Sequence, residues 1–426
     1  MSVSSESSPN VSTCSQHFRP ESFRLSNPEL FRDPYPAYRM LREQAPVHYS
    51  SMYGGSWVLS AYDDVAALLQ DPRLTNDRAT LPLMALPAGQ RGEFSDIVAA
   101  LKDWVAFFDG EPHAVQRQHM DQVFRILAPS RMLPVIQEVV DHLIDAWGTR
   151  NRVDLVADFA RPLPAMVITR LLGAPAADHE LLARWSDDIA YLFGASDLTL
   201  TDVRRGQASI HAFAGYLEDL ATQVAGSKPG SLLGRLLSSE TAGFRFTEAQ
   251  ARAQCMLLMF AGLEPTRYLV ANAVWSLDEH PDQKAMLLSD PRLWTAAVEE
   301  FLRHDTPVQY IGRMAAESFE YRGHHIEKGQ VVMLLAGSAN RDPKRFPEPD
   351  RLDIRRAPNP HLAFGRGPHH CIGAGLVRLQ TKVALRALFD RVPDLRICQV
   401  PTPVWNTNLG FHGFHSLTVS VNPTTS

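Results

Sequence analysis

The sequence predicts a mainly α-helical fold with a small β-rich lobe, and three observations support this. Nearly every segment between residues 101 and 277 repeats its apolar residues with the period of a helix. Strand-like stretches gather instead near residues 46–62, 319–335 and 414–421. The chain of 426 residues is 45% hydrophobic and 21% charged, an ordinary composition for a protein that buries a large core.

The elements follow one another in a clear order. DPYPAYRMLREQAPV predicts a short helix, PVHYSS and SWVLSAY predict two strands, and YDDVAALLQD predicts another helix. The all-helical middle part follows, with pieces that end at Gly148, Gly173 and Gly226. A helix ending in EEFLRHDTP, the strands of 319–335 and an irregular loop over 340–360 come next, and loops of that length are usually functional. CIGAGLVRLQTKVALRALFDRV predicts one more long helix, and FHSLTVSV predicts a closing strand.

The chain contains no internal repeat and no linker that would divide it. We therefore expect a single domain over residues 28–426. Residues 1–27 precede it as a polar, Ser-rich stretch that we expect to be a disordered tail. This stretch has no basic region followed by an apolar one, so we expect neither a signal peptide nor a membrane anchor.

Charge and cysteine content restrict the function. The net charge is −5, and Lys and Arg are dispersed without a basic block, which argues against a nucleic-acid partner. The four cysteines, Cys14, Cys255, Cys371 and Cys398, are irregularly spaced and form no C-x-x-C pair. A reducing compartment, and hence a cytoplasmic location, is the simplest interpretation.

The stretch HLAFGRGPHHCIGAG, residues 361–375, carries the strongest chemical signal. Gly365 and Gly367 permit a tight turn, after which Cys371 lies where the loop enters a helix. Free amides and the helix dipole favour a thiolate there, and a thiolate is a soft ligand for a metal or for the iron of a cofactor. Cys371 could instead be an inert buried cysteine. The other alternative is a zinc site with His361, His369, His370 and Cys371 as ligands. Against it, the side chains of three consecutive residues point in divergent directions, whereas zinc needs tetrahedral convergence.

The pattern F-G-x-G-x-H-x-C-x-G, from Phe364 to Gly373, resembles the haem-binding loop of the cytochrome P450 family. The resemblance implies the cytochrome P450 fold, haem b as cofactor, and Cys371 as the axial ligand of the haem iron, with Phe364 and Gly365 beside it. It extends over roughly residues 28–421.

The Glu-x-x-Arg pair of this family is matched by Glu300 and Arg303, and a basic residue of the following loop is matched by Arg351. The resemblance implies that these three residues form a buried ion network that holds the Cys371 loop. Taken alone, Glu-x-x-Arg is also the pattern of a common solvated pair on a helix.

The resemblance also assigns residues to the haem propionates, namely His113, Arg117, Arg313 and His369. Four cationic or hydrogen-bonding groups suit two carboxylates. The local pattern departs from the family in part, because the usual proline-rich turn reads DGEPH and Val115 stands where an arginine is usual.

FAGLEPTRYLV, residues 260–270, aligns with the central helix that crosses the haem on its oxygen side. The resemblance implies that Ala261 and Gly262 leave room for dioxygen and that Glu264 is the acid of a proton relay. Pro265 stands where the relay threonine is expected. A proline inside a helix costs about 3 kcal/mol and removes a backbone donor, so we expect a kink at this point.

Two residues beside Pro265 have alternative interpretations. Thr266 is rotated by about 100° from Pro265 and reaches the haem side only if the kink turns it inward. It could instead bond to a carbonyl of its own helix. Glu264 could be a helix-surface acid paired with Arg267, although its apolar surroundings argue against a solvated position.

The resemblance implies that loops and strands around the distal cavity supply a mostly apolar pocket, including Val308, Ile311 and Leu409. The alternative is that each of these residues is simply part of the core. Arg366 and Arg378 would lie on the proximal side, where positive charge steers an acidic partner.

The resemblance implies a monooxygenase that hydroxylates or epoxidises a lipophilic small molecule, with natural-product (secondary-metabolite) biosynthesis as the expected context. Dioxygen would be the co-substrate, and NAD(P)H would supply electrons through a ferredoxin or flavodoxin and its reductase. Three alternatives stay open because Pro265 lacks a hydroxyl. They are a peroxide-driven fatty-acid peroxygenase, an oxidative coupling or cyclisation enzyme, and a haem-binding sensor. Against the peroxygenase, Glu264 would repel the carboxylate of a fatty acid.

Overall fold

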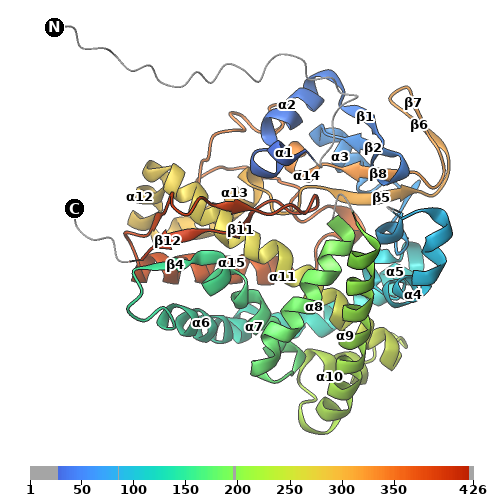
Figure 1. The fold of residues 1–426 in the computed structure, drawn as a ribbon, viewed down its shortest axis with the longest axis horizontal. Coiled ribbons are helices and arrows are strands. Elements are labelled where there is room, and N and C mark those ends of the chain that lie inside the picture. The colour runs from blue at the N-terminus through green and yellow to red at the C-terminus, as the bar shows by residue number, and fades with distance from the viewer. Residues whose placement is uncertain (1–26, 85, 195–197, 422–426) are drawn as a thin grey trace.

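The computed structural model describes residues 27–84, 86–194 and 198–421. The predicted tail therefore lies outside the described residues, except for Asn27 at its end. Within the described residues the predicted fold class is confirmed, because a large helical part carries a smaller β-rich lobe (Figure 1).

The β-rich lobe is built on a five-stranded sheet in the order β1-β2-β8-β5-β3. Its strands are β1 (Val47–Ser50), β2 (Ser56–Leu59), β8 (Val331–Leu334), β5 (Ile311–Ala315) and β3 (Leu74–Thr75). Only the β2–β8 pair is parallel, and the other three pairs are antiparallel. The helices of this lobe are α1 (Pro28–Arg32), α2 (Tyr35–Gln44), α3 (Tyr62–Leu68) and α14 (Ala336–Ala339).

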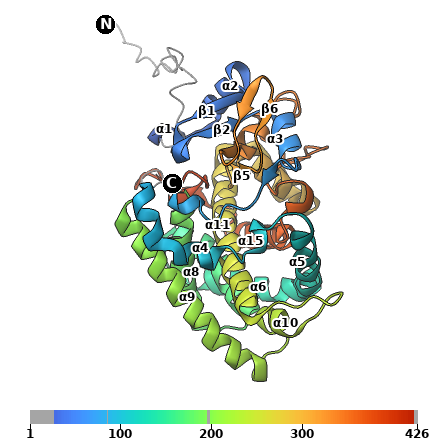
Figure 2. The ribbon, with the colours of Figure 1, turned by 90° about the vertical axis from the view of Figure 1, so that its right-hand side faces the viewer.

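The helical part surrounds one long helix, α11 (Glu248–Glu279), which runs through the middle of the molecule (Figure 2). A capping box of Thr247 and Gln250 fixes the start of α11, because each side chain bonds to the backbone N–H of the other residue. The helices that precede α11 are α4 (Ser95–Leu101), α5 (Gly110–Val123), α6 (Pro129–Asp145), α7 (Pro162–Leu172), α8 (His179–Gly194), α9 (Leu200–Ser227) and α10 (Leu232–Ser238). Those that follow are α12 (Pro281–Ser289), α13 (Trp294–His304) and α15 (Ala374–Arg391).

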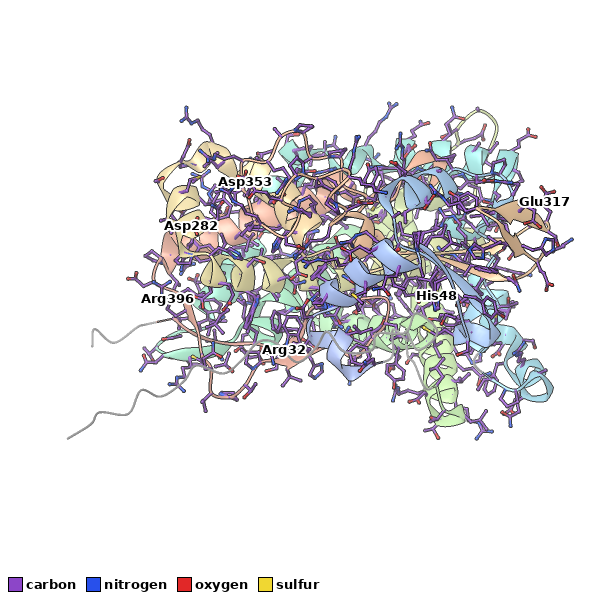
Figure 3. All side chains as sticks on the ribbon, turned by 90° about the horizontal axis from the view of Figure 1, so that it is seen from above. Arg32, His48, Asp282, Glu317, Asp353 and Arg396 are labelled. Atoms are coloured by element: carbon purple, nitrogen blue, oxygen red, sulfur yellow. The ribbon has the colours of Figure 1, made fainter. Side chains whose placement is uncertain are left out.

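Three smaller sheets complete the fold. β4 (Arg152–Asp154), β12 (Thr418–Ser420) and β9 (Arg396–Ile397) form one, β10 (Val404–Trp405) and β11 (Phe414–Ser416) another, and β6 (Phe319–Tyr321) and β7 (His324–Ile326) a hairpin. Seen from above, Asp282, Asp353 and Arg396 lie at one end of the molecule, and Glu317, next to the hairpin, lies at the other (Figure 3).

Two details of the predicted helical part were wrong. The stretch 101–277 contains strand β4, because residues 152–154 pair with the C-terminal strand β12. In addition, α9 continues through Gly226 and ends at Ser227. Gly173, by contrast, adopts a left-handed φ of +88° directly after α7, which is the usual place for a glycine at a helix end.

Candidate functional site

The loop that precedes α15 folds as its glycines predict. Gly365 and Gly367 have φ values of +67° and +78°, in the left-handed region that glycine adopts without strain. The N–H of Cys371 donates to the carbonyl of Phe364 at 2.9 Å and closes the turn. Cys371 is thereby held three residues before Ala374, where α15 begins.

Burial dominates the chemistry of the Cys371 thiol. The backbone N–H groups of Gly373 and Ala374 and the charges of Arg117 and Arg378 lower its pKa, as the helix start predicts. Burial acts more strongly in the other direction, so the pKa of the thiol is raised overall. A thiolate here therefore needs a cation bound directly to the sulfur, and this is what a metal-ligand bond supplies.

The four residues predicted for the propionates are brought together. His113 of α5, Arg117 of α5, Arg313 of β5 and His369 of the Cys371 loop all line one cavity of about 870 Å³. The rings of His113 and His369 stack with their centroids 3.9 Å apart. Nε2 of His369 also lies 3.4 Å from Oδ1 of Asp109.

One cation of this cavity, Arg313, has no ion pair among the described residues, whereas Arg117 pairs with Asp121 at 3.1 Å. Arg313 is 4% exposed, and within the described residues it has no ion pair, its side chain donating only to the carbonyl of Gly312 at 2.9 Å. Burial, with the charge of Arg78, lowers the pKa of Arg313 to about 9. Burial and the neighbouring His369 and Arg117 likewise lower the pKa of His113 to about 4. The unpaired Arg313 favours an anion, and the neutral His113 can donate a hydrogen bond, so these residues fit a carboxylate such as those of haem.

A buried ion network around Glu300 holds the irregular loop over 340–360, which leads into the Cys371 loop. Arg303 donates to both carboxylate oxygens of Glu300 at 2.7 and 2.8 Å, and neither side chain is exposed to solvent. Arg303 also donates to three loop carbonyls, those of Asn340, Pro349 and Arg351.

The prediction that the Arg351 side chain joins this network was wrong. Its guanidinium is 57% exposed and pairs with Glu348 at 3.3 Å. Arg356, five residues further on and 9% exposed, supplies the second guanidinium, at 3.2 Å from Glu300. The loop turns between the two positions, so that only the backbone carbonyl of Arg351 faces inward.

The middle of α11 presents a narrow accessible face between buried neighbours. Ala261 is exposed and Pro265, one turn later, is partly buried, so the two residues share a face. Leu263, Glu264 and Thr266 are buried. α11 runs without interruption from Glu248 to Glu279, so the helix accommodates Pro265.

Comparison with known proteins agrees with this geometry. The family described as Cytochrome P450 matches residues 211–392. Cytochrome P450 monooxygenase PikC of Streptomyces venezuelae is 35% identical over 91% of each chain. The chain belongs to the cytochrome P450 family.

Further relatives support the assignment. Polyketide biosynthesis cytochrome P450 PksS of Bacillus subtilis (strain 168) is 30% identical over 94% of this chain and 98% of the relative. The solved structure of epothilone B-bound cytochrome P450epoK superposes with a TM-score of 0.85 at 30% identity, covering 95% of this chain and all of the other. The protein is thus a P450 monooxygenase, and membership of the family implies haem. No helix of the described residues is long and apolar enough to cross a membrane.

The zinc alternative finds no support in this P450. His361 faces Glu299 at 3.1 Å, whereas His369 faces Asp109 in the cavity. Among the described residues, no three His, Cys, Asp or Glu side chains converge as metal ligands would.

Glu264 of this P450 lies in the interior. Its Oε2 accepts from Nη2 of Arg267 at 2.7 Å, and Arg267 in turn reaches Asp187 at 2.8 Å and the Tyr268 hydroxyl at 2.6 Å. Burial raises the pKa of Glu264 to about 8 against the attraction of Arg267, and Asp187 adds to the rise. Its pairing with Arg267 is therefore present, but buried and not on a solvated surface.

Two further residues of α11 are engaged in packing. The hydroxyl of Thr266 donates to the carbonyl of Gly262 at 2.8 Å, which is the alternative that the sequence left open. A Cβ at Gly262 would lie 2.5 Å from Cδ1 of Ile168 in α7. The missing side chain of Gly262 therefore allows α7 to approach closely.

The predicted pocket residues divide into two groups. Val308 and Ile311 are partly buried. Val308 forms a β-bridge with Phe411, and Ile311, the first residue of β5, lies 3.5 Å from the position of a Cβ at Gly365 in the Cys371 loop. Leu409 is 5% exposed and packs with Tyr38 and Tyr310, so it belongs to the core of the β-rich lobe.

The sequence did not indicate two residues at this site. Oδ2 of Asp109 accepts from the Thr75 hydroxyl and the backbone N–H of Asn76. Oδ1 accepts from the Asn76 side chain and also faces His369. The place of Asp109 directly before helix α5, where an N-cap Asp is common, was the available signal. The second residue is Arg78, whose charge acts on Arg313. No local sequence pattern indicated a role for Arg78.

Proposed function

We propose that this P450 oxidises a lipophilic small molecule in natural-product biosynthesis, by hydroxylation or epoxidation. The observation that carries the proposal is the accessible face of Ala261 and Pro265 on α11, which adjoins an aromatic wall. Phe260 stacks on Trp104 with ring centroids 5.5 Å apart and lies 5.4 Å from Phe193. The names of the relatives support the context, since PksS is described by polyketide biosynthesis and P450epoK was solved with epothilone B.

The residues of this chain would hold haem b in a defined way. Cys371 would be the axial ligand, with Phe364 and Gly365 beside it, and His113, Arg117, Arg313 and His369 would bind the propionates. When bound, haem supplies the oxidising chemistry with dioxygen and external electrons. The Glu300 network would hold the loop over 340–360, and through it the Cys371 loop that follows.

Proton supply is the unusual step in this site. Glu264 holds a proton near neutral pH because it is buried, but Pro265 offers no hydroxyl beyond it. The Thr266 hydroxyl is occupied by the carbonyl of Gly262. We therefore assign the missing hydroxyl to an ordered water or to the substrate itself.

A spectroscopic titration of the purified ferric holoprotein tests the proposal. Macrocyclic or polycyclic natural products and long-chain fatty acids would be added separately while the Soret band is followed for displacement of the iron-bound water. We expect a shift with hydroxyl-bearing natural products, and product formation with NAD(P)H, a ferredoxin and its reductase. Product with hydrogen peroxide alone would favour the peroxygenase alternative, and no product under either condition would favour the sensor.

A further inference from the structure

Arg78 carries a largely shielded charge that forms no ion pair with any described residue. It lies in the loop after β3, is only partly accessible, and its Nε is buried with no hydrogen-bond partner within the described residues. Its Nη1 lies 3.0 Å from the position of a Cβ at Gly312, and its Cζ lies 5.5 Å from the centroid of the Phe107 ring. None of the described carboxylates forms an ion pair with it.

The charged groups around Arg78 do not neutralise it. Arg313 of β5 adds a second positive charge, and Asp109, the nearest acid that acts on it, already accepts hydrogen bonds from Thr75 and Asn76. Tyr310 is the other group that acts on Arg78, and its hydroxyl is hydrogen-bonded to that of Tyr53 at 2.8 Å. An anion that joins the guanidinium here would supply the charge partner that the described residues lack.

A row of aromatic rings connects Arg78 with Phe260 on α11. Phe107, next to the guanidinium, lies 6.2 Å from Phe193, and Phe193 lies 5.4 Å from Phe260. Phe260 directly precedes Ala261. Arg78 is also absent from the lining of the cavity that collects His113, Arg117, Arg313 and His369.

From this arrangement we propose that Arg78, beside the Tyr310 hydroxyl, binds a carboxylate, and that the carboxylate belongs to the substrate. This inference rests on the proposed function and narrows its substrate class to lipophilic acids. The apolar body would lie along Phe107, Phe193 and Phe260. Glu264 keeps its proton near neutral pH, so it would not repel this carboxylate.

The test compares an acid with its neutral analogue on the holoprotein. Dodecanoic acid and 1-dodecanol would be titrated against the wild type, Arg78→Gln and Arg78→Lys, with the Soret shift as the readout. We expect Arg78→Gln to weaken binding of the acid about tenfold or more and that of the alcohol less than threefold, since a charge-assisted hydrogen bond is lost only with the acid. Arg78→Lys should restore part of the affinity. Arg204→Gln, which removes an exposed arginine paired with Glu93, is the matched control and should change neither affinity.

A haem propionate is the other possible source of the carboxylate. If so, Arg78→Gln would lower haem retention or shift the reduction potential and weaken acid and alcohol equally, which would overturn the substrate assignment. Equal affinities in all variants, or no Soret shift of the wild type with any acid, would overturn the inference as a whole. Selective binding of the acid through Arg78 without product from reductase or peroxide would contradict the proposed function and leave the carboxylate site standing.

Discussion

Glu264 should make the stability of this P450 depend on pH. Its pKa is raised by burial from its ordinary value of 4.5 to about 8. The folded protein therefore keeps this proton while the unfolded chain releases it, so stability falls as pH rises from about 4.5 to about 8, by at most about 1.4 kcal/mol per pH unit. Urea unfolding of the wild type and Glu264→Gln between pH 5.5 and 8.5 measures this. We expect the free energy of unfolding to fall less steeply with pH in the variant than in the wild type. Parallel pH dependences of the two proteins would show that Arg267 keeps Glu264 ionised.

Replacing Arg351 and replacing Arg356, which both lie in the loop over 340–360, should change the free energy of unfolding by very different amounts. Arg356→Gln leaves the Glu300 carboxylate with one guanidinium in the interior, and breaking a buried pair costs about 3–5 kcal/mol. Arg351→Gln removes an exposed pair with Glu348, for which we expect a change within about 0.5 kcal/mol. The free energies of unfolding from urea titrations decide the matter, and similar losses in both variants would contradict the assignment of Arg356.

The helix α11 offers a direct test of what Pro265 does. Pro265→Ala restores the backbone N–H without a hydroxyl, and Pro265→Thr restores both. We expect both variants to be more stable than the wild type, on the order of 1–3 kcal/mol, because a proline inside a helix is unfavourable. Only Pro265→Thr should raise the fraction of NAD(P)H that ends in product. Equal coupling of reductant to product in the two variants would show that a hydroxyl at this position is not what the site lacks.

The elements that the sequence predicted correctly are those with a local signal. α11 and α15 have long apolar periods, and the Cys371 loop has glycines at fixed spacing, so their structure follows from neighbouring residues. Strand β4 has only three residues and is defined by its pairing with β12, more than 260 residues away, which no local pattern reveals. For the same reason the assignment of Arg351 to the network was wrong, since Arg351 and Arg356 lie in one irregular loop and only the path of the backbone decides which side chain faces Glu300.

The site as a whole is assembled from segments that are distant in the chain. α5, β5, the Cys371 loop and α11 each contribute residues, and the β-rich lobe and the helical part meet around them (Figures 1 and 2). Arg78 shows the limit of sequence reasoning on this scale. Its unpaired charge becomes visible only when the loop after β3 is placed between Phe107 of the helical part and Gly312 of the sheet.

The surface around the Cys371 loop is where we expect an external electron donor to dock. Arg366 of this loop is exposed and has no ion pair within the described residues, whereas the nearby Arg378 is held by Glu299 at 2.6 Å. An unpaired surface charge is free to attract an acidic ferredoxin or flavodoxin, and its effect is on the rate of association.

We therefore expect Arg366→Gln to slow the reduction of the substrate-bound protein at low ionic strength, by about threefold to tenfold, and to leave substrate affinity unchanged. Stopped-flow reduction at several salt concentrations measures this, with Arg204→Gln as the exposed control. Because salt screens surface charges, the difference between Arg366→Gln and the wild type should shrink as ionic strength rises. Equal rates for both proteins at low salt would show that the electron donor docks elsewhere.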